Sequence, residues 1–297
     1  LILSSALSSG ILLFGLSLIY GSTGSIYFDT VGQLYANTPM QVLAFIFFFT
    51  GMGFKISLVP FHLWTADVYE GSPVNVTSYF SVISKGASVF ILIMVMFTVF
   101  HSIAFLWKDI VYLIAITTMV IGNLFALRQK NMKRFLAFSS IAQAGFIMLG
   151  ILGGNKIGMT ATVYFVLVYI FSNLGAFGVV SAISARTGKE SMDDYDGLYA
   201  TNPKLSLLMT LSMFSLAGIP PIAGFFGKFF LFTSAASGGY YWLVFIAVLN
   251  ATISLYYYLL VVKAMFINKN DKHIAFFKRN LTTRLALLIC AIGIFVI

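Results

Sequence analysis

The chain has 297 residues, of which 60% are hydrophobic and only 9% are charged, and its formal net charge is +9. Soluble globular domains average about 25% charged residues, so this composition excludes that class and indicates an integral membrane protein. The single cysteine, Cys290, excludes disulfides and cysteine-based metal sites, and the positive charge lies in short loops between apolar segments, which argues against a nucleic-acid-binding surface.

Apolar stretches of about 20 residues recur along the chain, and such stretches can only be transmembrane helices. We therefore predict an all-α fold, a polytopic membrane helix bundle without a soluble domain. Both chain ends fall inside apolar stretches and no initiator methionine or signal peptide is present, so we expect a partial chain of a longer protein. The predicted spans number about nine, the last cut short: residues 1–20, 41–66, 74–100, 107–127, 133–153, 158–184, 204–233, 240–267 and 283–297.

Basic residues are concentrated after the fourth, sixth and eighth predicted spans, in loops that all lie on one side of the membrane. The opposite side has only Lys108 and Lys156. Because loops rich in lysine and arginine stay on the cytoplasmic side, or its organellar equivalent, this asymmetry supports the span count and sets the orientation. The basic residues in or beside these loops are Arg128, Lys130, Lys133, Arg134, Arg186, Lys189, Lys204, Lys263, Lys269, Lys272, Lys278, Arg279 and Arg284.

The second predicted span, residues 41–66, carries Lys55, then Pro60, then His62, with no carboxylate before Asp67. A lysine deep in a bilayer costs about 2.5–3.5 kcal/mol on insertion scales, so Lys55 requires a polar cavity or a partner. Pro60 lacks a backbone donor, which predicts a break in the helix beside that lysine. Broken helices next to ionisable groups build the ion sites of many transporters, so this segment predicts part of an ion pathway.

Simpler interpretations of this segment stay open. Lys55 could extend its ammonium group from a helix end to the interface, with Pro60 only a kink. His62 is the only histidine near a span interior, and imidazole titrates closest to neutral pH. This histidine could act in a proton relay or serve as a fixed hydrogen-bond partner.

The seventh predicted span, residues 204–233, repeats the design of the second. Pro220 and Pro221 interrupt it beside Gly218, and Lys228 follows. The two broken spans are five helices apart, as expected for two copies of a five-helix unit with discontinuous helices in corresponding positions. Lysine and proline occur in opposite order in the two spans, so the correspondence is one of position and not of sequence.

Three lysines lie inside predicted spans, Lys55, Lys85 and Lys228, whereas all nine Asp and Glu residues lie in loops or at span ends. The membrane interior of the chain therefore holds potential cations and no anion. Burial favours the neutral form of lysine, and a lysine near neutrality can take up and release protons. The three lysines therefore predict a proton relay; the alternative is three unrelated side chains that reach the interface.

Smaller polar side chains mark a path near these lysines. Hydroxyl and amide groups inside membrane helices either line water or hold helices together, and the sequence alone does not separate these roles. The eighth predicted span offers Asn250, Thr252, Ser254 and Tyr256–Tyr258 as further candidates. The predicted path comprises Ser84 beside Lys85, then Ser139, Ser140 and Gln143 in the fifth span, and Tyr164, Tyr169, Ser172 and Asn173 in the sixth.

Five segments together resemble the antiporter-like subunits of respiratory complex I, the proton-pumping NADH:quinone oxidoreductase. The resemblance implies a fold of fourteen helices with two inverted five-helix repeats, of which this chain is similar to the sixth to the fourteenth. Residues 1–100 then hold three helices of the first repeat, residues 107–267 the complete second repeat, and residues 283–297 the start of a final helix. The segments are GFKISLVPFHLWTADVYEGSP, SKGA, RFLAFSSIAQAGF, SNLGAFGVVS and SLAGIPPIAGFFGKFFLF.

The resemblance also implies roles for single residues. Lys55 matches the lysine of the family's broken seventh helix, Lys85 the central lysine of the eighth, and Lys228 the lysine of the broken twelfth. His62 matches the histidine just past the proline. One branch of the family has a lysine in the twelfth helix and a related branch a glutamate, so Lys228 favours the first branch. The family's fifth helix supplies a glutamate to the first lysine; that helix is absent here, which implies a partner for Lys55 from outside these residues.

These features predict a membrane subunit that translocates protons with redox energy released elsewhere in the complex. The sequence contains no phosphate loop, dinucleotide-binding or nucleophile motif, so we expect no cofactor and no metal in this chain. The resemblance implies that the whole complex uses NADH, FMN, iron–sulfur clusters and quinone, and that the partners are neighbouring antiporter-like and small membrane subunits.

The expected location is the bacterial inner membrane, or the mitochondrial inner membrane if the protein is organellar. Two alternatives stay open: a subunit of a multisubunit sodium/proton antiporter, and a purely structural or assembly subunit.

Overall fold

The computed structural model describes residues 2–154, 156–268 and 274–297. Within these ranges the chain is helical and contains no β-strand, which confirms the all-α prediction. The helices are α1 (Ile2–Thr23), α2 (Phe28–Leu34), α3 (Pro39–Ile56), α4 (Leu63–Gly71), α5 (Val74–Tyr79), α6 (Lys85–Thr98), α7 (Ala104–Ala126), α8 (Met132–Leu152), α9 (Lys156–Thr187), α10 (Leu198–Thr201), α11 (Pro203–Ala217), α12 (Ala223–Ser237), α13 (Tyr241–Phe266) and α14 (Leu281–Val296), with a π-helical turn at Phe80–Ser84 and 3₁₀ turns at His101–Ile103 and Met192–Tyr195.

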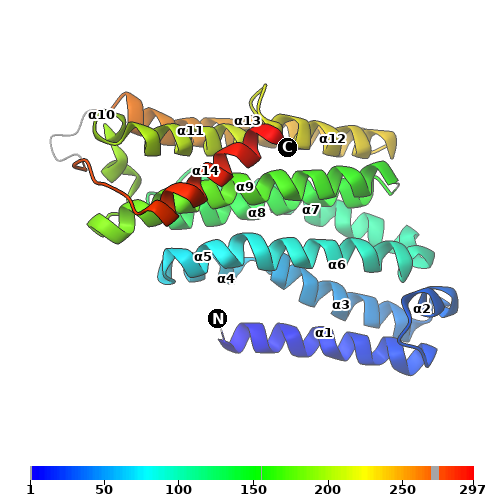
Figure 1. The fold of residues 1–297 in the computed structure, drawn as a ribbon. Coiled ribbons are helices and arrows are strands. Elements are labelled where there is room, and N and C mark those ends of the chain that lie inside the picture. Colours follow the sequence, from blue (N-terminus) through cyan, green and yellow to red (C-terminus); the bar gives the residue numbers. More distant parts are fainter. Residues whose placement is uncertain (1, 155, 269–273) are drawn as a thin grey trace.

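The long helices run side by side in one bundle (Figure 1). In the part of the chain that the structure describes, seven helical stretches are long and apolar enough to cross a membrane. The other two predicted spans correspond to α11 followed by α12, which have 15 residues each, and to the 16-residue α14. Each of the nine predicted spans therefore has a helical counterpart among the described residues.

The three basic loops meet at one end of the bundle, as the charge pattern predicts. The amide of Met132 donates to the carbonyl of Glu190 at 2.8 Å, which joins the α7–α8 loop to the segment after α9. The amide of Gly197 donates to the carbonyl of Ala264 at 3.0 Å, which brings in the end of α13. Of the predicted basic loop residues, Lys269 and Lys272 lie outside the described residues. We call this end of the bundle the basic end.

The bundle is built around α8, of which every residue except Arg134 is buried. Glycines allow its close approach to α7: Gly122 packs against Ala142 of α8, and Gly145 of α8 packs against Met119. Apolar side chains of α8 belong to both hydrophobic cores, one shared with α1, α3, α6 and α7 and the other with α4, α9, α11 and α13. This helix therefore connects the two halves of the chain.

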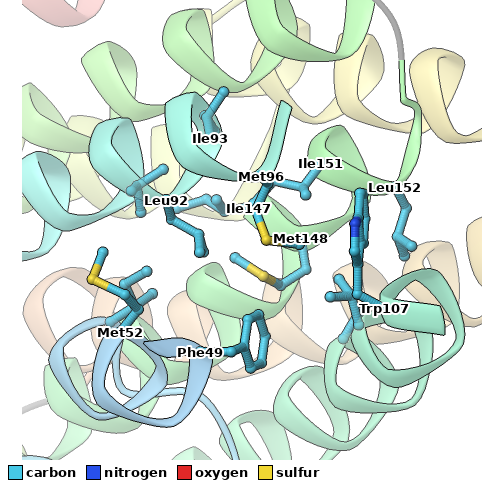
Figure 2. Packing of buried hydrophobic residues seen from close by; sticks show 14 of the residues in the cluster. Phe49, Met52, Leu92, Ile93, Met96, Trp107, Ile147, Met148, Ile151 and Leu152 are labelled. Atoms are coloured by element: carbon cyan, nitrogen blue, oxygen red, sulfur yellow. The ribbon is translucent and has the colours of Figure 1, made fainter. Parts of the chain in front are cut away.

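The two halves of α8 differ in polarity. Its polar interior residues are Ser139, Ser140 and Gln143, whereas residues 144–152, toward the end opposite the basic end, carry no polar side chain. Figure 2 shows this apolar half packed against α3, α6 and α7. We call this packed region the apolar plug; its labelled members are Phe49, Met52, Leu92, Ile93, Met96, Trp107, Ile147, Met148, Ile151 and Leu152.

Candidate functional site

The first broken helix is α3 followed by α4, and the non-helical backbone between them contains Pro60, as predicted. Ser57 ends α3 with a φ of 69°, in the left-handed region that residues other than glycine rarely adopt. The amide of Val59 donates to Oγ1 of Thr118 on α7 at 3.1 Å. The hydroxyl of Ser57 is buried and has no hydrogen-bond partner among the described residues. The break therefore places polar groups inside the bundle, where water can bind.

Lys55 lies in the last turn of α3, just before this break, and its side chain is exposed. It lines a mainly apolar cavity of about 430 Å³ between α1, α2, α3 and α6. One turn earlier, Gly51 packs against Ser8 and Leu12 in the first half of α1. No carboxylate of the described residues lies within 4 Å of the Lys55 ammonium. The side chain of Lys55 therefore faces this cavity beside α1, which we call the α1 groove, and apolar side chains do not enclose it.

His62 directly precedes α4 and is 8% exposed. Its Nδ1 has no hydrogen-bond partner among the described residues, and no hydrogen bond between described residues joins it to Lys55 or Lys85. The nearby Trp64 donates from Nε1 to the carbonyl of Phe54 at 3.0 Å and so ties α4 to α3 across the break. The structure thus places His62 in the break, with its Nδ1 free to bind a water and with no hydrogen bond to either lysine among the described residues.

Lys85 is the first residue of α6 and follows the π-helical turn, a feature that often occurs at functional sites. It is only 2% exposed. Its Nζ donates to the carbonyl of Ser140 at 3.2 Å and also contacts the Ser140 hydroxyl. The hydroxyl of Ser84, although adjacent in sequence, makes no hydrogen bond within the described residues. The partner of Lys85 is therefore on α8.

A second group of polar side chains joins α8 to α13 and α11. The hydroxyls of Ser139 and Tyr258 are 2.5 Å apart, and Nε2 of Gln143 donates to Tyr258 at 3.1 Å. The same Nε2 donates to the carbonyl of Leu216, near the end of α11, at 3.0 Å. The Gln143 Oε1 is buried and has no partner in the described parts of the chain. This group begins beside Ser140 and ends at the second broken helix.

The second broken helix is α11 followed by α12, and the break contains Gly218, Pro220 and Pro221, as predicted. Gly218 ends α11 with a φ of 84°, a conformation that glycine adopts without steric cost. The amide of Ile219 donates back to the carbonyl of Phe214 at 3.0 Å. The break therefore has a defined geometry that exposes the last carbonyls of α11 to neighbouring groups.

Lys228 of α12 uses one of these carbonyls. It is 5% exposed, and its Nζ donates to the carbonyl of Ala217 at 2.9 Å. The same ammonium lies 4.8 Å from the centre of the Phe146 ring of α8, which is a favourable cation–π distance. The carbonyl end of a helix carries a partial negative charge, so this position stabilises a cation. Lys228 also borders a cavity of about 390 Å³ between α12 and α13.

The other predicted path residues divide into two groups. The Ser172 hydroxyl lies 2.7 Å from that of Ser215 on α11. Asn173 donates to the Tyr169 hydroxyl at 2.9 Å, and Tyr169 in turn donates to the carbonyl of Ser81 in the π-helical turn at 3.0 Å. These residues therefore lie around Lys85 and α11. Tyr164 donates instead to the carbonyl of Ile297, away from the lysines.

A further buried polar cluster joins α7 to α13, and the sequence does not predict the contacts within it. Asn123 of α7 donates to Oδ1 of Asn250 on α13 at 2.9 Å, and the Tyr257 hydroxyl donates to Asn123 at 2.8 Å. An asparagine inside an apolar span was the available signal for Asn123. Among the three consecutive tyrosines of α13, Tyr257 and Tyr258 are buried, whereas Tyr256 is 60% exposed.

Residues 1–254 match the family model described as NADH:quinone oxidoreductase/Mrp antiporter, transmembrane. A curated relative from Phocaeicola vulgatus, named NADH-quinone oxidoreductase subunit N, is 54% identical over 297 residues, which cover all of this chain and 63% of the relative. A relative from Nostoc sp., named NAD(P)H-quinone oxidoreductase subunit 2, is 43% identical over 90% of this chain and 53% of its own length. The chain thus spans just over half to nearly two thirds of these relatives.

Solved structures give the same pattern. A chain of respiratory complex I from Thermus thermophilus with bound aureothin is 32% identical, has a TM-score of 0.82, and matches 99% of this chain and 64% of its own. A chain of the Mrp complex from Dietzia sp. is 27% identical, has a TM-score of 0.84, and matches 91% of this chain and 50% of its own. Lys228 favours the branch of the family that has a lysine in the second broken helix. The subunit N name of the Phocaeicola relative agrees with that prediction.

Proposed function

This chain belongs to the NADH:quinone oxidoreductase/Mrp antiporter family of transmembrane proteins, and we propose that it relays protons through its buried lysines as a membrane subunit of NADH:quinone oxidoreductase. The chain is an integral membrane protein. Its relatives of the subunit N type support the oxidoreductase branch of the family.

The observation that carries the proposal is the series of buried polar groups between Lys85 and Lys228. Ser140 contacts Lys85, the adjacent Ser139 contacts Tyr258, and Gln143 connects Tyr258 to the end of α11, where Lys228 binds. Hydroxyl groups both donate and accept, so they can pass a proton along the series. The amide of Gln143 is a poor carrier, and the unsatisfied Gln143 Oε1 supports a water that completes this step.

The apolar plug gives the relay a direction. Leu92 lies two turns after Lys85 on α6, and Ile147 lies two turns after Ser140 on α8, so both helices lead from the polar series into the plug. Within the described residues, a proton at Lys85 therefore meets apolar packing on the way straight to the end opposite the basic end. Transfer within the bundle toward Lys228, which borders a cavity, is the route with polar groups.

Lys55 requires a partner that the described residues do not supply. An opposite charge within about 4–6 Å favours the charged form of a lysine, and withdrawal of that charge favours proton release. The α1 groove, which Lys55 faces, supports a carboxylate from outside the chain described here. The family resemblance makes a glutamate on the preceding helix the partner that we propose.

The energy for pumping must come from other subunits. Moving one elementary charge against 100 mV requires about 2.3 kcal/mol. The family resemblance implies that the NADH, FMN, iron–sulfur and quinone chemistry takes place elsewhere in the complex. Neighbouring antiporter-like and small membrane subunits of the inner membrane are the proposed partners.

The proposal is tested by Lys228→Ala in the full-length protein within its complex. We expect assembly to persist and proton translocation, followed with a pH-sensitive dye in proteoliposomes, to fall several-fold. Lys204→Ala, an exposed lysine at the start of α11, is the matched control and should pump normally. Normal pumping by an assembled Lys228→Ala complex would leave only a structural role for the lysines.

A second candidate is a subunit of an Mrp-type sodium/proton antiporter, which the similarity to the Dietzia Mrp complex chain favours. The two functions differ in their energy source. Sodium-dependent proton exchange by the reconstituted protein without NADH or quinone would support the antiporter, whereas proton transport that requires NADH oxidation supports the first proposal.

A further inference from the structure

A polar groove of about 410 Å³ lies at the basic end of the bundle, between the start of α5, the end of α9 and residues 277–283. Three cationic side chains line it, namely those of Arg186, Lys278 and Arg279, and none of the described residues that line it is an aspartate or glutamate. Among the described residues, none of the three forms a salt bridge. The groove therefore concentrates positive charge that the described parts of the chain do not neutralise.

The walls of the groove are held in place by hydrogen bonds. Asn202, directly before α11, donates from Nδ2 to the carbonyl of Ala275 at 3.2 Å, and Ile274 beside it is buried. These contacts anchor the segment that carries Lys278 and Arg279. On the other side, the Ser181 hydroxyl of α9 donates to Oδ1 of Asn75 of α5 at 2.9 Å. The cations are therefore presented by fixed elements.

The groove also contains the start of α14, a 16-residue helix whose first residues have no side-chain cap. Backbone N–H groups at a helix start carry partial positive charge and attract anions. Burial, and secondarily the nearby Arg284, lowers the pKa of Arg279 below its ordinary value. A bound anion would offset both effects, so an anion is the ligand that this groove fits electrostatically.

We propose that this groove binds the phosphodiester headgroup of an anionic membrane lipid. The groove lies where α5, α9 and α14 reach the basic end, which is the depth of lipid headgroups in a bundle that crosses the membrane. From this depth into the membrane-spanning part of the bundle, α14 exposes a stripe of apolar side chains that acyl chains would cover, including Leu281, Leu285 and Leu288. A free phosphate would use the cations but not this stripe, so the combination favours a lipid.

The test is lipid binding by the full-length protein in its purified complex, measured by native mass spectrometry after addition of phosphatidylglycerol or phosphatidylcholine. We expect wild-type complex to retain phosphatidylglycerol preferentially. The combined Arg186→Gln, Lys278→Gln and Arg279→Gln variant should bind it at least about tenfold more weakly, because each interfacial cation contributes substantially to such binding.

A matched control removes the same charge from the basic end outside the groove, by Arg128→Gln, Lys130→Gln and Lys204→Gln. This control should retain the preference for phosphatidylglycerol. A charge-conserving variant, Arg186→Lys with Lys278→Arg and Arg279→Lys, should bind at close to the wild-type level, which guards against misfolding of the neutral variant. Equal losses in the groove variant and the control, or displacement of the lipid by millimolar inorganic phosphate, would overturn the lipid site.

Discussion

Tyr258 lies where α8, α11 and α13 meet, and its hydroxyl is the only group that contacts both Ser139 and Gln143 within the described residues. Consecutive residues of a helix point about 100° apart, so of Tyr256, Tyr257 and Tyr258 only one can face the serines of α8. Tyr257 turns to Asn123 instead, and Tyr256 is exposed. The position of one hydroxyl therefore decides whether Ser139 and Gln143 are connected.

Replacement of this hydroxyl by Tyr258→Phe should slow proton translocation several-fold. The ring volume stays, and Gln143 keeps its bond to the Leu216 carbonyl, so the stability loss should be only about 1 kcal/mol. Tyr256→Phe on the same helix is the control and should pump normally. Proton translocation is measured in proteoliposomes at equal complex content; an unchanged rate in Tyr258→Phe would show that the series does not run through this residue.

Single residues were predictable where their chemistry is conspicuous in an apolar span. The sequence predicts Lys85, Lys228, Ser140 and Gln143 as buried polar groups, because each interrupts an otherwise apolar segment, and the structure buries all four. It predicts the same for Lys55, whose side chain is exposed at the end of α3. The sequence also suggests Ser84 and Tyr164, but these side chains make no hydrogen bond to the lysines. Which side of a helix faces the lysines depends on its packing against other helices, and the sequence of one span does not encode that packing. The backbone carbonyl that binds Lys228 could not be predicted, since every residue has one.

At the scale of elements, both broken helices were predictable from proline and glycine, and both occur where expected. The π-helical turn before Lys85 was not predicted, because its residues, FSVIS, have no composition that distinguishes them from an ordinary helix. In the second break, Gly218 combines two requirements. Its φ of 84° excludes most side chains, and a Cβ there would lie 3.0 Å from Cδ of Lys228.

We therefore expect Gly218→Ala to impair function more than strain alone explains. The left-handed backbone costs a residue other than glycine about 1–3 kcal/mol, and the new methyl group would push Lys228 from the Ala217 carbonyl. Gly239→Ala is a matched control, since Gly239 has a φ of 85° and no atom within 4 Å of its added Cβ. Both variants should lose a similar amount of thermal stability, and only Gly218→Ala should lose proton translocation. Equal proton translocation by the two variants would show that the geometry at Gly218 does not affect the function of Lys228.

At the scale of the whole molecule, the basic end joins the two halves of the chain through α8. Arg134 reaches Asp67 and Glu70 of α4 at 2.8 and 2.7 Å, and Lys133 reaches Glu190, after α9, at 2.9 Å. Charge placement in the sequence predicts that these groups share one side of the membrane. It does not predict which charges pair, because membrane orientation depends on how many basic residues a loop carries and not on the contacts that they make.

The two neighbouring cations should contribute unequally to stability. The Arg134 side chain is 34% exposed and its partners are 73% and 41% exposed, so Arg134→Gln should cost about 0–1 kcal/mol. Lys133 is only 7% exposed, also donates to the carbonyl of Ser72 at 3.2 Å, and pairs with a Glu190 side chain that is 25% exposed. Lys133→Gln would leave that carboxylate partly buried and unpaired, which should cost about 1–3 kcal/mol.

Thermal unfolding of the purified full-length protein, followed by intrinsic fluorescence, measures this difference. The double variant Lys133→Gln with Glu190→Gln removes the unpaired charge, so it should be more stable than Lys133→Gln alone. If the loss came from packing of the lysine stem, the second substitution would restore nothing. Recovery in the double variant would therefore identify this partly buried ion pair as the contact that holds α8 to the segment after α9 at the basic end.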